Sequence, residues 1–394
     1  MKMHRRTATL AHGTTDHEGG ESMTVATIAD LRCRVLRISD KTEWTFIELV
    51  CSDGVTGIGE ASVNGGGAAL KAHAKSLAER LRGKPALPNS VPVLSEPPQG
   101  GLLQNAVASA TEQALWDAQG HRLGQPVTAL LGGARRDRVA AYANINRRTR
   151  DRTPEGFADS ARLARDAGFT HVKIAPFDGV GDGDRMTEGG RVAAGLDCIA
   201  AVCAEMGNGA RVLVDCHWRL DEPTAFRVLA AAAEMELFWL ECPVPEAPAH
   251  NRVLRALKQE AARRGVRMAG LEGCLNLAEM RPHIEGGHYD VLMPDVKYIG
   301  GLGPTRAVAD LAATAGQHVA PHNPTGPVCH AASVAVSATL ANFLTLEVQF
   351  DESPHFDGLV RSGLMVEDGT LPVSSAPGLG VALDADLVRE LEIP

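Results

Sequence analysis

The chain lacks the features that mark membrane-bound, disulfide-rich and nucleic-acid-binding proteins. No apolar run in its 394 residues is long and uninterrupted enough to span a membrane. The eight cysteines form no C-x-x-C pair, and several lie in apolar runs, which predicts reduced, buried thiols in a cytoplasmic protein. Acidic residues outnumber lysine and arginine by 48 to 39, and the net charge of −9 argues against nucleic acid as the main partner. An anionic small substrate stays open, because a buried metal or lysine sets the local field.

The first third of the chain has the pattern of a small α+β domain behind a polar tail. Residues 1–22 contain no apolar core of a signal peptide, and we expect them to be a disordered tail. Alternating apolar positions and turn residues then predict an antiparallel meander, and helical spacing follows it. The predicted strands are 28–39, 44–51 and 55–60, and the predicted helices are 66–82 and 102–123. We therefore expect a capping domain at 23–133.

From residue 139 onward, short apolar strands alternate with alanine-rich helices. Eight repeated βα units predict an α/β fold, a (β/α)8-type barrel over 134–350, with 351–394 returning to the capping domain. An open doubly wound sheet is the alternative, but no G-x-G-x-x-G follows its first strand. The expected strands are 139–145, 171–175, 211–217, 237–242, 267–272, 291–296, 318–322 and 343–347.

Three carboxylates fall at the ends of consecutive predicted strands. Asp215 ends the third strand, Glu241 the fourth and Glu272 the fifth. A barrel places its catalytic groups at this end of its strands, so the three side chains should converge. Unshielded carboxylates repel one another, and ligands that are all oxygen favour Mg²⁺ over zinc. A single carboxylate at such a position is usually a helix cap or a surface group, but three in register predict a metal site.

The next two predicted strands end in Asp295 and His322. Neighbouring strands would bring the carboxylate beside the imidazole. Such a partner fixes the tautomer of the ring and raises its basicity, as a general base requires. The alternative is a core histidine with a structural aspartate.

Three further polar residues lie on inward positions of the predicted barrel. Glu347 ends an apolar run, where a carboxyl can stay protonated and donate to a developing oxyanion; it could also be an ordinary ion-pair partner. Lys173 lies inside an apolar strand, should remain charged, and could bind a substrate carboxylate or form a structural ion pair. His217 lies two residues beyond Asp215, hence on the same face of a strand, and could be a second acid or base.

Motifs across residues 28–394 resemble the enolase superfamily in its mandelate racemase-like branch. The capping domain carries DGVTGIGEAS at 53–62 and ALWDAQGHRLGQPVTALLGG at 114–133. The barrel carries VDCH, LECP, GLEG, MPDVKYIGG and PHNPTGPV at its strand ends. The resemblance implies that Asp215, Glu241 and Glu272 bind Mg²⁺ and that His322 with Asp295 is the general base. It also implies that Glu347 stabilises the enediolate oxygen.

One departure from the racemase pattern narrows the expected reaction. Lys173 matches the first lysine of the family's K-x-K motif, but Ala175 stands in place of the second, so a two-base racemisation is not expected. This resembles galactonate dehydratase-like members, in which a histidine at the position of His217 is the general acid. The resemblance implies dehydration of a sugar acid to a 2-keto-3-deoxy acid by a Mg²⁺-dependent hydro-lyase, a homo-oligomer without nucleic acid or membrane partners.

Several alternatives stay open at this point. Within the same fold, the chain could be a cycloisomerase of sugar-acid lactones or an epimerase, and Ala175 weighs against the latter. A non-catalytic relative and a metal-dependent aldolase are disfavoured by the intact base pair and by the capping-domain motifs. Substrate contacts are expected from Asn144, Asn146 and Trp44, and from the loops Ser39–Trp44 and Val63–Ala68, although these can also be ordinary surface loops.

Overall fold

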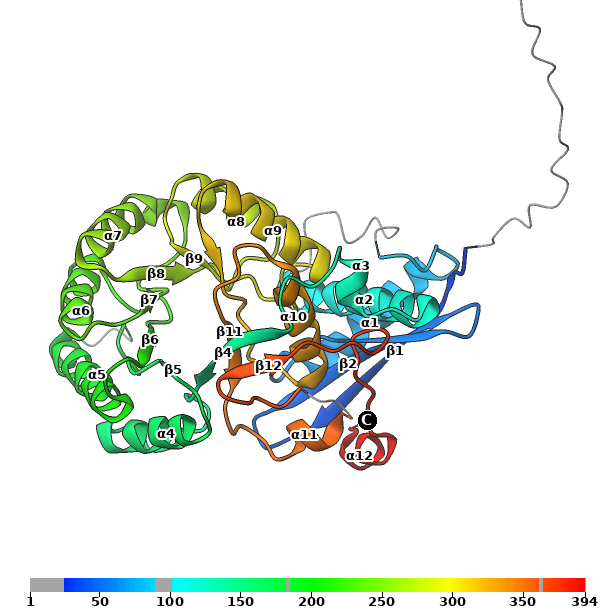
Figure 1. Ribbon diagram of the computed structural model, residues 1–394, viewed down its shortest axis with the longest axis horizontal. Helices are drawn as coiled ribbons and strands as arrows, with labels where there is room; N and C mark the ends of the chain where they lie inside the picture. Colours follow the sequence, from blue (N-terminus) through cyan, green and yellow to red (C-terminus); the bar gives the residue numbers. More distant parts are fainter. Residues whose placement is uncertain (1–24, 89–100, 182–184, 361–363, 394) are drawn as a thin grey trace, which may run out of the picture.

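Parallel strands inside an arc of helices make up the larger part of the molecule, and a three-stranded antiparallel sheet with two long helices lies beside it (Figure 1). The computed structural model describes residues 25–88, 101–181, 185–360 and 364–393. The predicted tail, residues 1–22, lies outside these residues. The predicted fold class, a (β/α)8-type barrel with an N-terminal α+β cap, is confirmed.

The cap, which we call the lid, consists of β1 (Ile28–Arg37), β2 (Glu43–Cys51) and β3 (Thr56–Glu60), with α1 (Gly67–Leu81) and α2 (Gly101–Leu123). The strands pair antiparallel in the order β1-β2-β3. Strand β3 lies so close to α2 that a Cβ on Gly57 would stand 2.0 Å from the Ala114 carbonyl oxygen, and one on Gly59 would stand 1.9 Å from that of Ala110. The two glycines of the G-I-G motif therefore allow the helix to pack directly on the backbone of β3.

The barrel is a parallel sheet of eight strands among the described residues, in the order β10-β9-β8-β7-β6-β5-β4-β11. A parallel bridge between Val319 and Phe343 links β10 to the chain just before β11 and so joins the two edges. Inward side chains form a separate apolar cluster that includes Tyr142, Leu213 and Trp239. The strands are β4 (Arg138–Asn144), β5 (His171–Ile174), β6 (Arg211–Asp215), β7 (Trp239–Glu241), β8 (Arg267–Gly270), β9 (Val291–Leu292), β10 (His318–Val319) and β11 (Leu346–Gln349).

Helices follow the strands and cover the outside of the barrel, as the alternating pattern predicts (Figure 1). Helix α10 is buried along its whole length and lies between the barrel and the lid (Figure 1). The barrel helices are α4 (Pro154–Asp166), α5 (Arg185–Met206), α6 (Glu222–Glu234), α7 (Asn251–Arg264), α8 (Leu277–Glu285), α9 (Leu302–Thr314) and α10 (Pro327–Thr339). The short helices are α3 (Val127–Leu130), the 3-10 turn η2 (Pro248–His250), α11 (His355–Leu359) and α12 (Ala385–Leu391).

Several barrel strands are shorter than predicted at the end that carries the polar residues. Strand β6 stops at Asp215, and after Cys216 the residues His217 and Trp218 have φ values of 46° and 59°. Cys242 (φ 44°) and Leu271 (φ 77°) interrupt β7 and β8 in the same way. Left-handed backbone costs energy for a residue with a Cβ, and such residues concentrate at functional sites.

The C-terminal segment contacts both parts of the molecule. Strand β12 (Thr370–Pro372) pairs antiparallel with β4. Farther along, Glu392 forms a bridge with Leu36 of the lid, and the Ile393 amide donates to the Val35 carbonyl. The division of the chain at residues 133 and 350 stays a prediction.

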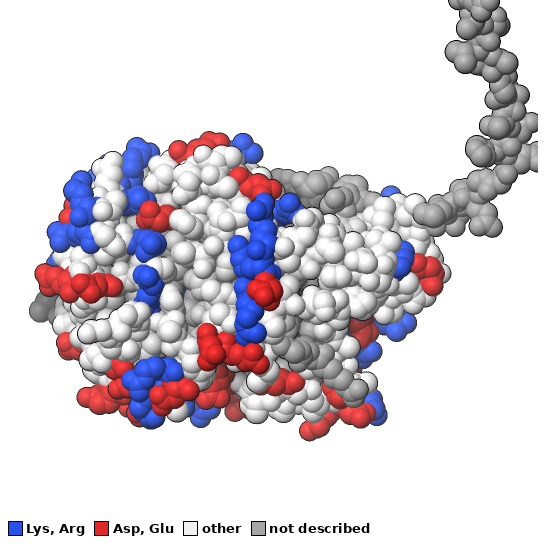
Figure 2. Space-filling model, viewed as in Figure 1, with Lys and Arg blue, Asp and Glu red and all other residues white. Residues whose placement is uncertain are grey.

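Two sequence-based expectations concern the chain as a whole. All eight cysteines are free thiols, as predicted. Within the described residues, no helix combines the length and the apolar character that crossing a membrane requires. The face shown in Figure 2 carries acidic and basic groups interspersed, with a row of basic side chains where the barrel meets the lid.

Candidate active site

The three predicted metal ligands are buried at one end of the barrel. Asp215 and Glu241 are the last residues of β6 and β7 and stand opposite each other in the parallel ladder. Glu272 lies two residues beyond β8. Ligand atoms of Asp215, Glu272 and His217 lie within 4.8 Å of one another, so this group has the geometry of a metal site. Glu241 is outside that group, and its two oxygens accept hydrogen bonds from Lys173 and Trp239.

The carboxylates of Asp215, Glu241 and Glu272 lie close enough to repel one another. Burial raises the pKa of Glu241 to about 7 and that of Glu272 well above its ordinary value, and the neighbouring carboxylates add to both shifts. Oε2 of Glu272 is buried with no hydrogen-bond partner among the described residues. A hard divalent cation would supply the missing partner and relieve the repulsion, so the residues present fit such a metal.

Lys173 lies between two carboxylates in the barrel interior. Its Nζ is 2.8 Å from Oε1 of Glu241 and 3.1 Å from Oε1 of Glu347, and its side chain is 1% exposed. Burial alone lowers the pKa of a lysine, but the two carboxylates outweigh it and raise the pKa of Lys173. The two contacts therefore favour the charged ammonium.

Glu347 has the surroundings of the ion-pair partner that the sequence left open beside a protonated carboxyl. The pKa of Glu347 is lowered to about 2. Burial acts to raise that pKa, and the charges of Lys173 and His322 and the hydrogen bonds from Asn144 and Asn323 outweigh it. The Asn144 side chain donates to Oε1 at 2.5 Å and the Asn323 amide donates to Oε2 at 3.0 Å. These contacts favour the ionised form, and a role of Glu347 at an enediolate oxygen stays a prediction.

The structure brings Asp295 and His322 together. Nδ1 of His322 lies 2.8 Å from Oδ2 of Asp295, and its Nε2 lies 3.4 Å from Oε2 of Glu272. Asp295 is fully buried, and its pKa is lowered because Lys297 and His322 outweigh the effect of burial. An ionised carboxylate accepts the Nδ1 proton and leaves the Nε2 lone pair directed toward the carboxylate cluster.

His217 reaches the cluster by a route that the sequence did not predict. The sequence placed His217 on the same face of a continuing strand as Asp215. The strand ends at Asp215 instead, and with the left-handed backbone of His217 its Nε2 lies 2.8 Å from Oδ2 of Asp215. Burial acts to lower the pKa of His217, but the hydrogen bond with Asp215 and its charge raise it. Its side chain is 47% exposed, so the ring can exchange protons with solvent or a ligand.

The predicted substrate contacts have other partners in the structure. Asn144 donates to Glu347, and its Oδ1 accepts from both nitrogens of Asn146. Asn146 in turn accepts a hydrogen bond of 2.6 Å from the Ala175 amide. Contact of these two asparagines with a substrate stays a prediction. Trp44 is 1% exposed and stacks edge-on against Phe356. Contact of Trp44 with a substrate also stays a prediction.

Four residues that sequence reasoning did not single out hold the site in place. Trp239 donates to Oε2 of Glu241, and Lys297 contacts Asp295. Asn323 binds Glu347, and Glu60 of the lid accepts hydrogen bonds from the start of α10. Lys297 could have been identified from the sequence in the same way as Lys173, because it is also a lysine within an apolar run. Trp239 and Glu241 lie two residues apart on β7, whereas the partners of Asn323 and Glu60 lie on other elements, so nothing local in the sequence marks those two contacts.

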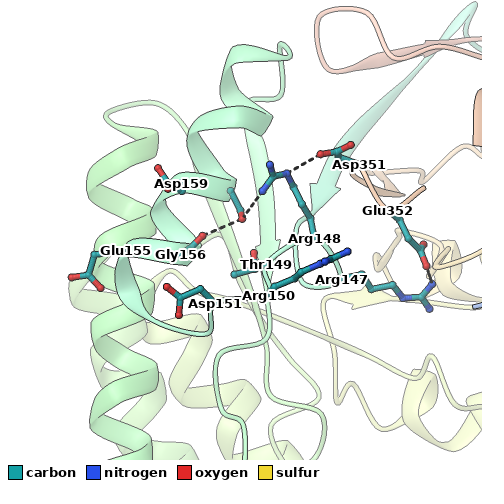
Figure 3. Close-up of a pocket in the computed structure, with 11 residues that line it drawn as sticks. Arg147, Arg148, Thr149, Arg150, Asp151, Glu155, Gly156, Asp159, Asp351 and Glu352 are labelled. Atoms are coloured by element: carbon teal, nitrogen blue, oxygen red, sulfur yellow. Dashed lines mark hydrogen bonds and ion pairs between the residues drawn. The ribbon is translucent and has the colours of Figure 1, made fainter. Parts of the chain in front are cut away.

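A cavity of about 490 Å³ lies at the rim of the barrel, beside the loop that follows β4 (Figure 3). It contains none of the predicted metal ligands. Its lining residues are Arg147, Arg148, Thr149, Arg150, Asp151, Glu155, Gly156, Asp159, Ser160, Asp351 and Glu352. Arg147 pairs with Glu352 at 2.6 Å, and Arg148 pairs with Asp351 at 2.9 Å (Figure 3).

Arg147, at this cavity, acts electrostatically on Tyr298, whose ring lies near the candidate base. Burial raises the pKa of the Tyr298 phenol, and the Arg147 charge acts in the opposite direction, so the two groups lie close enough to interact. The Tyr298 ring centre is 6.4 Å from that of His322. Glu352 also accepts a hydrogen bond of 3.3 Å from Thr42, in the lid loop before β2.

Comparison with known families agrees with this geometry. Residues 25–132 match the mandelate racemase/muconate lactonizing enzyme N-terminal domain, and residues 156–387 match the enolase C-terminal domain-like family. The chain belongs to the enolase superfamily, in its mandelate racemase/muconate lactonizing enzyme group. Both the predicted family and the prediction that the chain is an enzyme of it are confirmed.

Several relatives of this chain are named as dehydratases of sugar acids. The chain is 29% identical to D-xylonate dehydratase of Haloferax volcanii over 88% of its own length and 84% of the relative's. It is 30% identical to D-gluconate/D-galactonate dehydratase of Picrophilus torridus, over 72% and 70% of the two chains. It is 28% identical to D-galactonate dehydratase of Klebsiella pneumoniae, over 88% and 91%.

Solved structures share the fold along nearly the whole chain. A mandelate racemase/muconate lactonizing enzyme from Jannaschia sp. CCS1 has a TM-score of 0.82 at 25% identity, covering 93% of this chain and 98% of that one. The 3,6-anhydro-D-galactonate cycloisomerase of Zobellia galactanivorans has a TM-score of 0.81 at 24% identity, covering 93% and 100%. At that identity, the second likeness bears on the fold alone.

Proposed function

We propose that this protein is a Mg²⁺-dependent acid sugar dehydratase, which removes the proton on carbon 2 and eliminates the 3-hydroxyl. The observation that carries the proposal is the pair of histidines on the carboxylate cluster, His217 on Asp215 and His322 between Glu272 and Asp295. Ala175 leaves no lysine for a second base on the strand that carries Lys173. The dehydratase names of the relatives support the same reaction.

Asp215, Glu241 and Glu272 would hold the metal, which, when bound, stabilises negative charge developing on the substrate carboxylate. Three carboxylates and no thiolate make up the proposed ligand set, which favours Mg²⁺ over softer metals. Lys173 is held between Glu241 and Glu347, and its charge adds to the field at the same end of the barrel. Together these groups would lower the barrier more than the base does, since a positioned base contributes only about 10²–10⁴-fold.

His322 takes the carbon 2 proton on Nε2, because its Nδ1 donates to Asp295. The C3–O bond then breaks, and the departing hydroxyl takes a proton from His217 and leaves as water. His217 is suited to this role because its pKa is raised by Asp215, so its ring is protonated more readily than a free imidazole. The resulting enol then loses its O–H proton on carbon 2 and gains a proton on carbon 3, which gives a 2-keto-3-deoxy acid.

The proposal is tested by screening acid sugars with Mg²⁺ for formation of a 2-keto acid, followed by isotope exchange in D₂O with two variants. His322→Asn should lose both product formation and exchange of the carbon 2 proton. His217→Asn should lose product formation by about 10²–10⁴-fold and keep the exchange, because only the acid is missing.

Other outcomes would replace the proposal. Exchange without keto acid from any sugar would favour an epimerase, and lactone rearrangement would favour a cycloisomerase. Glu241→Gln should be as inactive as His322→Asn, and an active Glu241→Gln protein without metal would contradict the mechanism. Unchanged dehydration by His217→Asn would leave His322 as both base and acid.

A further inference from the structure

Lys297 is a fully buried lysine in direct contact with the candidate base pair. Its side chain is 0% exposed, and Nζ donates to Oδ2 of Asp295 at 2.7 Å. The backbone amide of Lys297 donates to the other oxygen, Oδ1, also at 2.7 Å. Oδ2 is the same atom that lies 2.8 Å from Nδ1 of His322. One residue therefore holds both oxygens of the carboxylate that orients the imidazole.

We propose that Lys297 is a positioning residue for proton abstraction: it fixes the Asp295 carboxylate so that His322 keeps the tautomer with a free Nε2. The inference rests on the proposed function, which makes His322 the base. It adds a residue that does not itself touch the substrate, since Lys297 has no exposed surface.

Two physical effects follow from the contacts of Lys297. First, donors on Oδ1 and Oδ2 together oppose rotation of the carboxylate, so Oδ2 stays aimed at the imidazole. Second, a carboxyl buried without a cation is driven toward its protonated form, and a protonated Asp295 would donate to Nδ1 and reverse the tautomer. Reversing the tautomer of the histidine in a serine-protease triad lowers kcat by about 10⁴-fold.

The charge balance makes Lys297 and Asp295 a matched pair. A buried ammonium needs a counter-ion, and Asp295 is the carboxylate that contacts this one. The ammonium also lies 4.6 Å from the centre of the Tyr298 ring, a favourable placement for a cation. Removing either charge alone leaves the other uncompensated in the interior, whereas removing both restores neutrality.

The experiment is a double-mutant cycle with Lys297→Met, Asp295→Asn and the double variant. Lys297→Met should lower kcat by about 10²–10³-fold and change KM by less than about threefold. Asp295→Asn and the double variant should have the same kcat within about twofold, because a residue that acts through Asp295 has nothing left to position. If the fold-loss of kcat in the double variant equals the product of the losses in Lys297→Met and Asp295→Asn, Lys297 acts independently of Asp295 and the inference is wrong.

Controls separate positioning from a general loss of structure. The Mn²⁺ affinity of Lys297→Met should equal that of the wild type. The isotope effect on kcat for a substrate deuterated at carbon 2 should be at least as large in Lys297→Met as in the wild type. A parallel fall of Mn²⁺ affinity and kcat would assign Lys297 a merely structural role. If Lys297→Met does not fold, the charge-neutral double variant against Asp295→Asn still decides the question.

The same set of proteins distinguishes this inference from the proposed function. Full activity of His322→Asn would overturn the proposed function, and this inference with it. An inactive His322→Asn beside a Lys297→Met protein with wild-type kcat would overturn only the role of Lys297.

Discussion

Glu60, at the end of lid strand β3, accepts a hydrogen bond of 2.8 Å from the hydroxyl of Thr325, three residues after His322 in the barrel. The Gly326 amide donates to the same oxygen at 2.6 Å. The other oxygen accepts from the amides of Val328 and Cys329 in the first turn of α10. A carboxylate suits this place because the first amides of a helix have no partners within it. A lid residue thus fixes the loop that begins at the candidate base.

Glu60→Gln should destabilise the protein by about 2–4 kcal/mol, because an amide nitrogen cannot accept and leaves buried backbone donors unpaired. Urea unfolding at pH 7 measures the change. Glu48→Gln is the matched control in the same sheet, since Glu48 forms a partly exposed ion pair with Arg34 that should contribute less than about 1 kcal/mol. Equal stabilities of the two variants would show that Glu60 is not a structural link between lid and barrel.

Glu272→Gln should stabilise the metal-free protein by about 1–3 kcal/mol while abolishing tight binding of a divalent ion. The reason is that Glu272 is buried beside two other carboxylates, and one of its oxygens has no hydrogen-bond partner among the described residues. Urea unfolding in EDTA and Mn²⁺ titration give the two readouts.

Glu246→Gln is the contrasting control for Glu272, because Glu246 is a partly buried carboxylate with hydrogen-bond partners in the same region. Its Oε1 accepts from the Leu271 amide at 2.7 Å and from the Tyr289 hydroxyl at 2.8 Å, so the amide should destabilise the protein. A Glu272→Gln protein that is less stable than the wild type without metal would refute the account of charge crowding.

Glu347 should make the stability of the metal-free protein fall in acid. Because its pKa is lowered from 4.5 to about 2 in the folded protein, the stability it contributes is complete above pH 4.5 and is lost as the pH falls toward 2. The full effect is on the order of 3 kcal/mol. Unfolding free energies between pH 6 and 3 should therefore drop more steeply for the wild type than for Glu347→Gln. Glu367→Gln, at a carboxylate that is 69% exposed, should follow the wild-type curve, and identical slopes for all three proteins would contradict the prediction.

Glu352→Gln should shift substrate preference toward sugar acids with a second, distal carboxylate. Glu352 neutralises Arg147, and without it the guanidinium adds positive potential on the side of Tyr298 and His322. We expect KM for dicarboxylic relative to monocarboxylic substrates to fall by roughly three- to tenfold, or about 1 kcal/mol. Asp351→Asn is the matched control, because it removes the ion-pair partner of Arg148, the neighbouring arginine of the same cavity. A similar shift in both variants would assign the effect to net charge alone.

Local patterns were sufficient to predict the architecture. Buried parallel strands are short apolar runs, and eight of them at regular spacing predicted the barrel, although β9 and β10 are much shorter than expected. The convergence of Asp215, Glu241 and Glu272 followed from strand order alone. The sequence left the state of Glu347 open because its main partner, Lys173, lies on β5, and no local signal reports that contact. Trp44 looked like a loop residue, but Phe356 of α11 covers it.

By itself, the sequence determined the fold class, the family, and which carboxylates and histidines belong to one end of the barrel, because strand order and spacing fix those positions. Only the tertiary structure decided which groups are charged and how they point. Lys173 makes Glu347 an anion, left-handed backbone turns His217 onto Asp215, and Lys297 holds Asp295. Desolvation and the distances between charges set these properties, and both depend on side chains brought together from distant parts of the chain.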